Sequence, residues 1–269
     1  MVKCDVDDQG VATVTLNRPE KHNAFNQHTL AQLRAMLHQL KENPDVRVLV
    51  LRAQGAHFSA GADLAWMQTM ITASETENIQ DAQQLADVLH ALDTFPQPTI
   101  ALVQGNAYGG AIGLICCCDI AIATVSAQCC LSEVKIGLVP ATISPYVCRA
   151  MGQRHARRYM LTSETITSEQ ALSLHIFHRV VPDLADLDTA LHDTLTHLLN
   201  NSPDALRITK SLCHLCNATP LSAALRQKTA HIIAAVRASP QGQDGLNAFL
   251  NKRAPPWQHV RPDPPSPTT

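Results

Sequence analysis

The sequence predicts an α/β fold in its first two-thirds, followed by a mostly helical remainder. Short apolar runs with strand character alternate there with segments whose apolar residues recur at helical spacing. Some of these runs are apolar throughout, as expected for strands covered on both faces of a sheet. Aromatic residues make up only 4% of the 269 residues, so Ala, Leu, Val and Ile must build most of the core.

The first predicted elements are a strand, a helix and a second strand. Residues 10–17 alternate between apolar and polar in the strand manner. Asn26 is a candidate cap for a helix with leucines at helical spacing, which Pro44 would stop. Residues 46–52 are almost entirely apolar and predict a buried strand.

The same alternation continues to about residue 124, and helices dominate after Pro145. Predicted helices span 77–94, 110–117, 154–161 and 168–174, with further helical patterns in 184–236; predicted strands span 99–103 and 119–124, with a short extended piece at 180–181.

Charge and hydropathy restrict the partners. The net charge of -2 argues against a dominant nucleic-acid surface. No apolar run approaches the length that crosses a bilayer, and the first residues, MVKCDVDDQG, lack the layout of a secretory or transit peptide. We therefore expect a cytoplasmic protein whose mature chain begins near Met1.

The nine cysteines do not predict disulfides or a metal centre. Residues 116–118 and 129–130 are neighbouring cysteines in apolar runs, which are usually small buried residues. Cys213 and Cys216 have metal-like spacing on a predicted helix, but no second ligand pair lies near them in the sequence. We expect no metal and no permanently bound cofactor.

Three ordered segments carry the strongest functional signal. Residues 57–64 are HFSAGADL, residues 104–114 are QGNAYGGAIGL, and residues 131–140 are LSEVKIGLVP. Supporting segments are LNRP at 16–19, NAFN at 23–26, CDI at 118–120 and GLNAFL at 245–250.

Together these segments resemble the enoyl-CoA hydratase/isomerase (crotonase) superfamily over roughly residues 5–257. The segments 112–114, 141–146 and 157–159 look most like bacterial methylglutaconyl-CoA hydratase-like members, a group assigned to leucine catabolism and related branched-acyl breakdown. The resemblance implies a ClpP-like spiral of ββα units with two roughly perpendicular sheets, followed by a C-terminal helical region that builds trimers or hexamers (dimers of trimers).

The resemblance also implies a site for coenzyme A thioesters. Reactions at the α and β carbons of a thioester build negative charge on the thioester oxygen, which backbone N–H groups can stabilise. The resemblance assigns these donors to Ala60 and Gly110, and gives acid/base catalysis to Glu133. One departure matters: many hydratases of this family carry a second glutamate where this chain has Gly113.

The resemblance assigns further residues to the CoA arm and the acyl group. Ser144 and Tyr146 would meet the acyl end, and Phe249 and Lys252 would close the site from a neighbouring subunit. The other expected binding residues are Lys21, Asn23, Ala24, Phe25, Ala62, Asp63, Leu64, Gly109 and Gly113.

Hydration of a 2-enoyl-CoA, possibly one with a branched acyl group such as 3-methylglutaconyl-CoA, is the leading hypothesis. The alternatives are Δ3,Δ2-enoyl-CoA isomerisation with a single glutamate, and a non-catalytic relative that binds CoA or RNA. Thiol redox chemistry through the cysteine cluster is a fourth hypothesis, which requires solvent-reactive thiols.

The expected domain organisation has three parts. Residues 1–190 form the spiral core, residues 191–256 form the C-terminal helical region, and residues 257–269 form a Pro-rich tail that we expect to be disordered.

Overall fold

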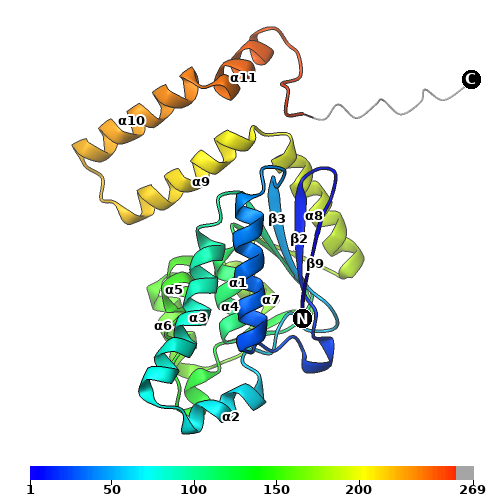
Figure 1. Cartoon of the computed structure of the whole chain (residues 1–269), viewed down its shortest axis with the longest axis vertical. Coiled ribbons are helices and arrows are strands. Elements are labelled where there is room, and N and C mark those ends of the chain that lie inside the picture. The colour runs from blue at the N-terminus through cyan, green and yellow to red at the C-terminus, as the bar shows by residue number, and fades with distance from the viewer. Residues whose placement is uncertain (259–269) are drawn as a thin grey trace, which may run out of the picture. The chain divides into compact units, whose positions relative to one another are not determined.

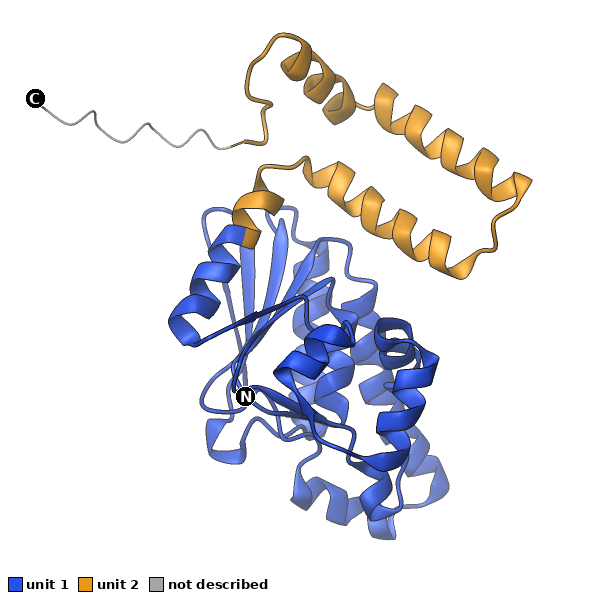
Figure 2. Cartoon of the chain, turned by 180° about the vertical axis from the view of Figure 1, so that it is seen from behind, with its two compact units in different colours: residues 1–193 blue, residues 194–269 orange. Residues whose placement is uncertain are grey.

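The computed structural model describes residues 1–258 and divides the chain into two compact units, residues 1–193 and 194–269 (Figure 2). The division lies within helix α8 (Leu184–Leu199). The expected disordered tail lies outside the described residues from residue 259 onward.

A six-stranded sheet forms the centre of the first unit, in the order β1-β2-β3-β4-β6-β9 (Figure 1). Strand β1 runs antiparallel to β2, and every other neighbouring pair is parallel. The strands are β1 (Val2–Val6), β2 (Val11–Leu16), β3 (Val48–Ala53), β4 (Thr99–Val103), β6 (Ile120–Thr124) and β9 (Arg179–Val181). All five residues of β4 are buried, which agrees with the apolar run that predicted it.

A second, smaller sheet has the order β5-β7-β8. Its strands are β5 (Ala107–Tyr108), β7 (Gln128–Cys130) and β8 (Ile166–Thr167). The sequence does not predict these strands, because segments of two or three residues are too short to show a period.

Helix α1 (Gln27–Glu42) shows how the sequence pattern becomes packing. Asn26 caps it, since its side chain accepts a hydrogen bond from the Thr29 amide. Leu33 and Leu37 face inward and are at most 2% exposed, and each contributes about 1.5–3 kcal/mol of burial free energy. Helix α3 (Glu75–Asp93) packs against α1, and α4 (Gly110–Cys117) packs against α3 (Figure 1).

The remaining helices are shorter or belong to the second unit. In the first unit they are α2 (Leu64–Thr72), α5 (Ser144–Met151), α6 (Gln153–Thr162), α7 (Ser168–Ser173) and the 3-10 turns η1 (Pro19–Lys21) and η2 (Glu133–Ile136). The second unit contains α9 (Pro203–Ala218), α10 (Ala223–Ala238) and α11 (Pro240–Leu250). None of the helices within residues 1–258 combines the length and apolar character that a bilayer crossing needs.

The structure contains two features that the sequence prediction does not include. The segment Ser144-Pro145-Tyr146 forms the first turn of α5, where a proline is favoured because its φ is preset. Helix α2 is not among the predicted helices; Leu64, Met67 and Ile71 recur in it at helical spacing, although none of its residues is buried.

Candidate functional site

Two backbone segments run side by side and create the centre of the site. The amides of Phe58 and Ser59 donate to the Asn106 carbonyl at 3.1 and 3.2 Å, and the Tyr108 amide donates to the Ser59 carbonyl at 3.0 Å. Gly61 has a φ of +85°, and a Cβ on it would lie 3.0 Å from the Tyr108 carbonyl oxygen. Only glycine fits this position without strain, so the AG pair of the motif serves a close backbone approach.

The structure does not leave the Ala60 amide available as an oxyanion donor. This N–H donates to the His22 carbonyl at 2.9 Å. A donor that is already paired must break its bond before it can stabilise new charge, which removes the advantage of a preorganised site. The expectation for Ala60 is therefore revised in favour of a neighbouring amide.

That neighbour is Ala62. Around it, the Gly61 amide donates to Ser59 Oγ at 3.2 Å, and the Asp63 amide donates to the Phe25 carbonyl at 2.7 Å. Among residues 58–63, Ala62 alone has a backbone N–H without an acceptor in the described part of the chain.

The second unpaired amide stands at the start of α4. Gly110 is the first residue of this helix, a position whose N–H has no intrahelical acceptor. Gly109 precedes it with φ +52° and ψ −119°, and donates its own N–H to the Cys130 carbonyl at 3.0 Å. The positive end of the helix dipole adds to the attraction for negative charge at Gly110.

The Glu133 carboxyl lies directly over this helix start. A Cβ on Gly109 would be 3.0 Å from Glu133 Oε1, so a side chain there would displace the carboxyl from its present position. Glu133 Oε2 is buried and has no hydrogen-bond partner among the described residues. Burial raises the pKa of this carboxyl above its ordinary value. A partly desolvated, unpaired carboxyl beside an anion site is suited to proton transfer.

The position of the missing second glutamate is filled. A Cβ on Gly113 would lie 2.4 Å from Ile143 Cγ2 and 3.1 Å from Leu89 Cδ2. Both neighbouring side chains are at most 1% exposed. The wall at this place is therefore apolar, and Ile143 occupies the space that a longer side chain would need.

The residues expected to hold the CoA arm fall into two groups. Asn23, Ala24, Phe25 and Asp63 are buried parts of the framework around residues 58–63. Lys21 in η1 is exposed, and Leu64 at the start of α2 is 79% exposed.

Ser144 and Tyr146 lie on α5. Ser144 Oγ donates to the Pro140 carbonyl at 2.6 Å. The Tyr146 ring carries the Arg149 guanidinium 5.6 Å from its centroid, and Arg149 also pairs with Asp93.

Phe249 and Lys252 belong to the second unit. Phe249, on α11, is 81% exposed. Lys252 follows the helix in a left-handed conformation with φ 53°.

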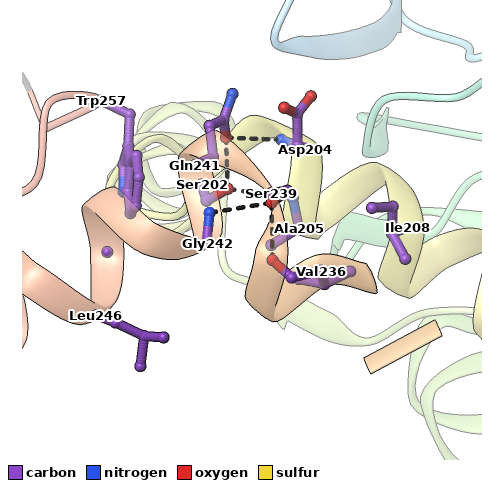
Figure 3. Close-up of a pocket in the computed structure, with 11 residues that line it drawn as sticks. Ser202, Asp204, Ala205, Ile208, Val236, Ser239, Gln241, Gly242, Leu246 and Trp257 are labelled. Carbon is purple, nitrogen blue, oxygen red and sulfur yellow. Dashed lines mark hydrogen bonds between the residues drawn. The ribbon is translucent and has the colours of Figure 1, made fainter. Parts of the chain in front are cut away.

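The second unit also contains a pocket where α9, α10 and α11 meet (Figure 3). Gln241 Oε1 accepts hydrogen bonds from Ser202 Oγ at 2.6 Å and from the Asp204 amide at 3.2 Å. Ser239 Oγ donates to the Val236 carbonyl and accepts from the Gly242 amide. These polar groups satisfy one another and form helix caps, so they explain the local fold and indicate no chemistry.

The cysteine cluster lies in the core. Cys117, Cys118, Cys129 and Cys130 are buried, and no disulfide joins any of the nine cysteines within residues 1–258. Burial raises the pKa of Cys116 to about 12, which disfavours the reactive thiolate. Within residues 1–258 no group of three or more His, Cys, Asp or Glu side chains could hold a metal ion.

Sequence reasoning missed three residues that shape this site: Ala62 as an amide donor, Ile143 as the wall at Gly113, and Arg18, whose guanidinium pairs with Asp63 at 2.9 Å. Arg18 offers one signal, an arginine directly after a strand and before a proline in the LNRP segment. Ala62 lies in the 57–64 motif and was expected to bind CoA, but the motif does not show which of its amides is unpaired. Ile143 offers no signal, because packing depends on the folded backbone.

Comparisons with known proteins identify the family. A family model described as enoyl-CoA hydratase/isomerase matches residues 7–260. A 2,3-dehydroadipyl-CoA hydratase from Escherichia coli (strain K12) is 31% identical over 251 residues, covering 93% of this chain and 96% of the relative.

Solved structures are similar over nearly the whole chain. The crystal structure of an enoyl-CoA hydratase from Shewanella pealeana has a TM-score of 0.92 and 46% identity, with 95% of each chain covered. Pseudomonas aeruginosa AtuE has a TM-score of 0.91 and 34% identity, covering 95% of this chain and 98% of that one. The chain therefore belongs to the enoyl-CoA hydratase/isomerase family and has the crotonase fold.

Proposed function

We propose that the protein adds water across the double bond of a 2-enoyl-CoA. The thioester oxygen binds between the N–H groups of Ala62 and Gly110, which hold the negative charge of the enolate. Glu133 handles the proton. The observation that carries this proposal is the buried, unpaired Oε2 of Glu133 above the free amide end of α4.

One carboxyl is enough to account for both proton transfers of the hydration reaction. Glu133, as a carboxylate, takes a proton from water while the water oxygen bonds to Cβ. The π electrons of the double bond move to the thioester oxygen, where the two amides stabilise the enolate. The enolate then collapses and Cα takes a proton from the Glu133 carboxylic acid, which regenerates the carboxylate. The raised pKa suits this exchange, because the group must be both base and acid in one cycle.

The direct test is Glu133→Gln, assayed by water addition to a 2-enoyl-CoA. We expect the rate to fall by about 10²–10⁴-fold. Glu169→Gln, which removes an exposed carboxyl in α7, is the matched control and should keep the parental rate. A Glu133→Gln enzyme with full hydratase activity would refute the assignment.

The pH dependence of kcat/KM is a second test of the role of Glu133. Because the pKa of Glu133 is raised, the acid limb of kcat/KM should lie above the ordinary value of 4.5. Activity should fall about tenfold per pH unit below that limb as the base is protonated. The residual activity of Glu133→Gln should lack this limb.

Isomerisation of a 3-enoyl-CoA to a 2-enoyl-CoA is the second candidate. The apolar wall at Gly113 favours it, since moving one proton along the acyl chain needs a single carboxyl and no positioned water. Product analysis separates the two. A 3-enoyl-CoA converted to its 2-enoyl isomer, with no 3-hydroxyacyl product from either substrate, would replace the hydratase proposal.

A branched acyl group such as 3-methylglutaconyl-CoA is the substrate class that we propose, which would give the protein a role in leucine catabolism. Ile143 and Leu89 make the packing beside Gly113 apolar, and Tyr146 has a hydroxyl for a distal carboxylate, which Ser144 could also bind by releasing the Pro140 carbonyl. The E. coli relative is named for 2,3-dehydroadipyl-CoA, an acyl chain that also ends in a carboxylate. A panel of branched, straight-chain and dicarboxylic enoyl-CoAs tests this, and equal kcat/KM across the panel would contradict it.

We further propose a homotrimer, or a hexamer made of two trimers, in the cytoplasm. The support is the exposed apolar surface of the second unit, where Phe249 is 81% and Leu250 74% exposed. In such an assembly Phe249 and Lys252 would close a neighbouring copy's CoA site, while Lys21 and Leu64 would contact the CoA arm. Light scattering on purified protein decides the assembly, and a monomer that retains full activity would contradict it.

A further inference from the structure

Arg18 is a buried charged residue that the proposed reaction does not use directly. It follows β2 and is 9% exposed. One guanidinium nitrogen donates to Asp63 Oδ2 at 2.9 Å and the other donates to the Ala24 carbonyl at 2.8 Å. The Arg18 side chain therefore links the backbone of Ala24 to the side chain of Asp63, which is far from it in the sequence.

Asp63 directly follows Ala62, and Phe25, the residue after Ala24, is hydrogen-bonded to the residues on both sides of Ala62. The Gly61 carbonyl accepts from the Phe25 amide at 2.7 Å, and the Asp63 amide donates to the Phe25 carbonyl at 2.7 Å. Phe25 directly follows Ala24, whose carbonyl Arg18 holds. One guanidinium thus contacts both the residue before Phe25 and the side chain of Asp63, and it helps to hold both in position.

Because the peptide unit is planar, these contacts also set the direction in which the Ala62 N–H points. Residues Gly61 and Ala62 share a trans peptide unit, in which the C=O and the N–H point in opposite directions. Because Phe25 fixes the direction of the Gly61 carbonyl, it also fixes the direction of the Ala62 N–H, which points away from the 18–25 segment. Any shift of Phe25 or Asp63 rotates this N–H.

Arg18 has an electrostatic consequence as well. The Asp63 carboxylate is one residue from the proposed oxyanion donor and is 9% exposed, so water screens it poorly. Without a cation beside it, its negative charge would oppose the charge that develops on the thioester oxygen. Arg18 supplies that cation in a short ion pair.

We propose that Arg18 is a positioning residue of the oxyanion site, which aims the Ala62 N–H through Ala24-Phe25 and Asp63 and neutralises the Asp63 carboxylate. This inference rests on the proposed function, because it concerns the same thioester oxygen. It assigns a role in rate to a residue that touches no substrate.

The test compares Arg18→Met and Arg18→Lys with Arg179→Met, which removes an exposed arginine from its pair with Asp193. Steady-state kinetics with a 2-enoyl-CoA give kcat and KM. We expect kcat to fall about 30–300-fold in Arg18→Met, with KM changed less than fivefold. Arg18→Lys keeps the charge but not the two-point contact, and should lose about 5–30-fold. Arg179→Met should match the parent.

A spectroscopic readout separates aiming from a loss of folded protein. The stretching frequency of a ¹³C-labelled thioester carbonyl in a bound, unreactive saturated acyl-CoA reports the strength of the oxyanion donors. The parent and Arg179→Met should shift it to lower frequency on binding, and Arg18→Met should lose at least half of that shift. Thermal unfolding establishes that each variant is folded at the assay temperature.

If Arg18→Met does not fold, Arg18→Lys and Asp63→Asn test the inference in its place. Asp63→Asn removes the charge but keeps an oxygen for the Ala65 amide, and should reduce the carbonyl shift only in part. Parental kcat and carbonyl shift in folded Arg18→Lys and Asp63→Asn would overturn the inference. That result differs from failure of the proposed function, which would appear as a parent protein that hydrates no 2-enoyl-CoA.

Discussion

The two halves of the candidate site are built in different ways. On the oxyanion side, a dense set of hydrogen bonds pairs the backbone donors of residues 58–63 apart from Ala62, and the Gly110 amide at the start of α4 has no acceptor among residues 1–258. On the proton-transfer side there is one carboxyl, Glu133, with an unpaired oxygen and an apolar wall at Gly113.

The difference teaches how rigidity is distributed in this site. Oxyanion stabilisation depends on donors that do not move when charge develops, so a tightly paired backbone is favourable. A proton carrier must exchange partners during the cycle, so an unpaired carboxyl is favourable there even though its burial costs free energy. The following predictions test this contrast from its largest expected effect to its smallest.

Gly110→Pro should have the largest effect, because proline removes the N–H at a helix position that tolerates proline. We expect kcat to fall about 10²–10³-fold, measured as hydration of a 2-enoyl-CoA. Gly110→Ala is the matched control. It keeps the N–H, and its Cβ would meet Leu85 and Phe25 at 3.4 and 3.6 Å, which is ordinary contact.

Comparing the two variants distinguishes the effect of losing the Gly110 N–H from the effect of filling the space beside it. Gly110→Ala should keep kcat within a few-fold of the parent, while KM absorbs any crowding of the thioester. Equal kcat losses in both variants would show that the space at Gly110 matters and its N–H does not.

The sequence predicted the larger elements of this fold and the segments that form the proposed oxyanion side. Strand β4 and helix α4 were predictable because long apolar runs and a Gly pair before a helical segment have clear local causes. The motif also identified the loop that carries the donor. It did not distinguish Ala60 from Ala62, because the difference is a hydrogen bond to His22, which is 38 residues away from Ala60 in the chain.

The proton-transfer side was predictable only in part. Glu133 was identified from its segment, and the glycine at 113 was visible as a departure. What replaces the second carboxyl was not, since Ile143 reaches Gly113 through tertiary packing between α4 and the residue that precedes α5. Packing partners that are distant in sequence leave no mark on a local pattern.

That packing gives the second prediction, on stability. Gly113→Ala should destabilise the protein by about 1–3 kcal/mol through overpacking, although alanine is the better helix former. Ile143→Ala should cost about 2–5 kcal/mol through the cavity it leaves. In the double variant the new methyl enters that cavity, so the total should be smaller than the sum by about 1 kcal/mol or more.

Denaturant unfolding of the four proteins measures this coupling. Gly113→Ala combined with Leu37→Ala, a core leucine in α1, is the control pair and should be additive because the atoms nearest to a Cβ on Gly113 belong to Ile143 and Leu89 and not to Leu37. A Gly113→Ala protein as stable as the parent would show that the apolar wall is loose and leaves room for a polar group.

The smallest predicted effect is a gain in stability when Glu133, the proposed acid/base, loses its charge. Burial raises the pKa of Glu133 in the folded protein above the ordinary value of 4.5, so the ionised carboxyl disfavours folding at neutral pH. Glu133→Gln should therefore raise the free energy of unfolding at pH 7 by up to about 1 kcal/mol, or about 2–4 °C in Tm. Below about pH 4 the carboxyl is protonated in both the folded and the unfolded state, so the advantage should vanish.

Thermal unfolding of the parent, Glu133→Gln and Glu169→Gln between pH 4 and pH 8 measures the difference in Tm between each variant and the parent. If Glu133→Gln is less stable than the parent at every pH, Glu133 stabilises the fold through its contacts, and the two sides of the site share the same rigid construction.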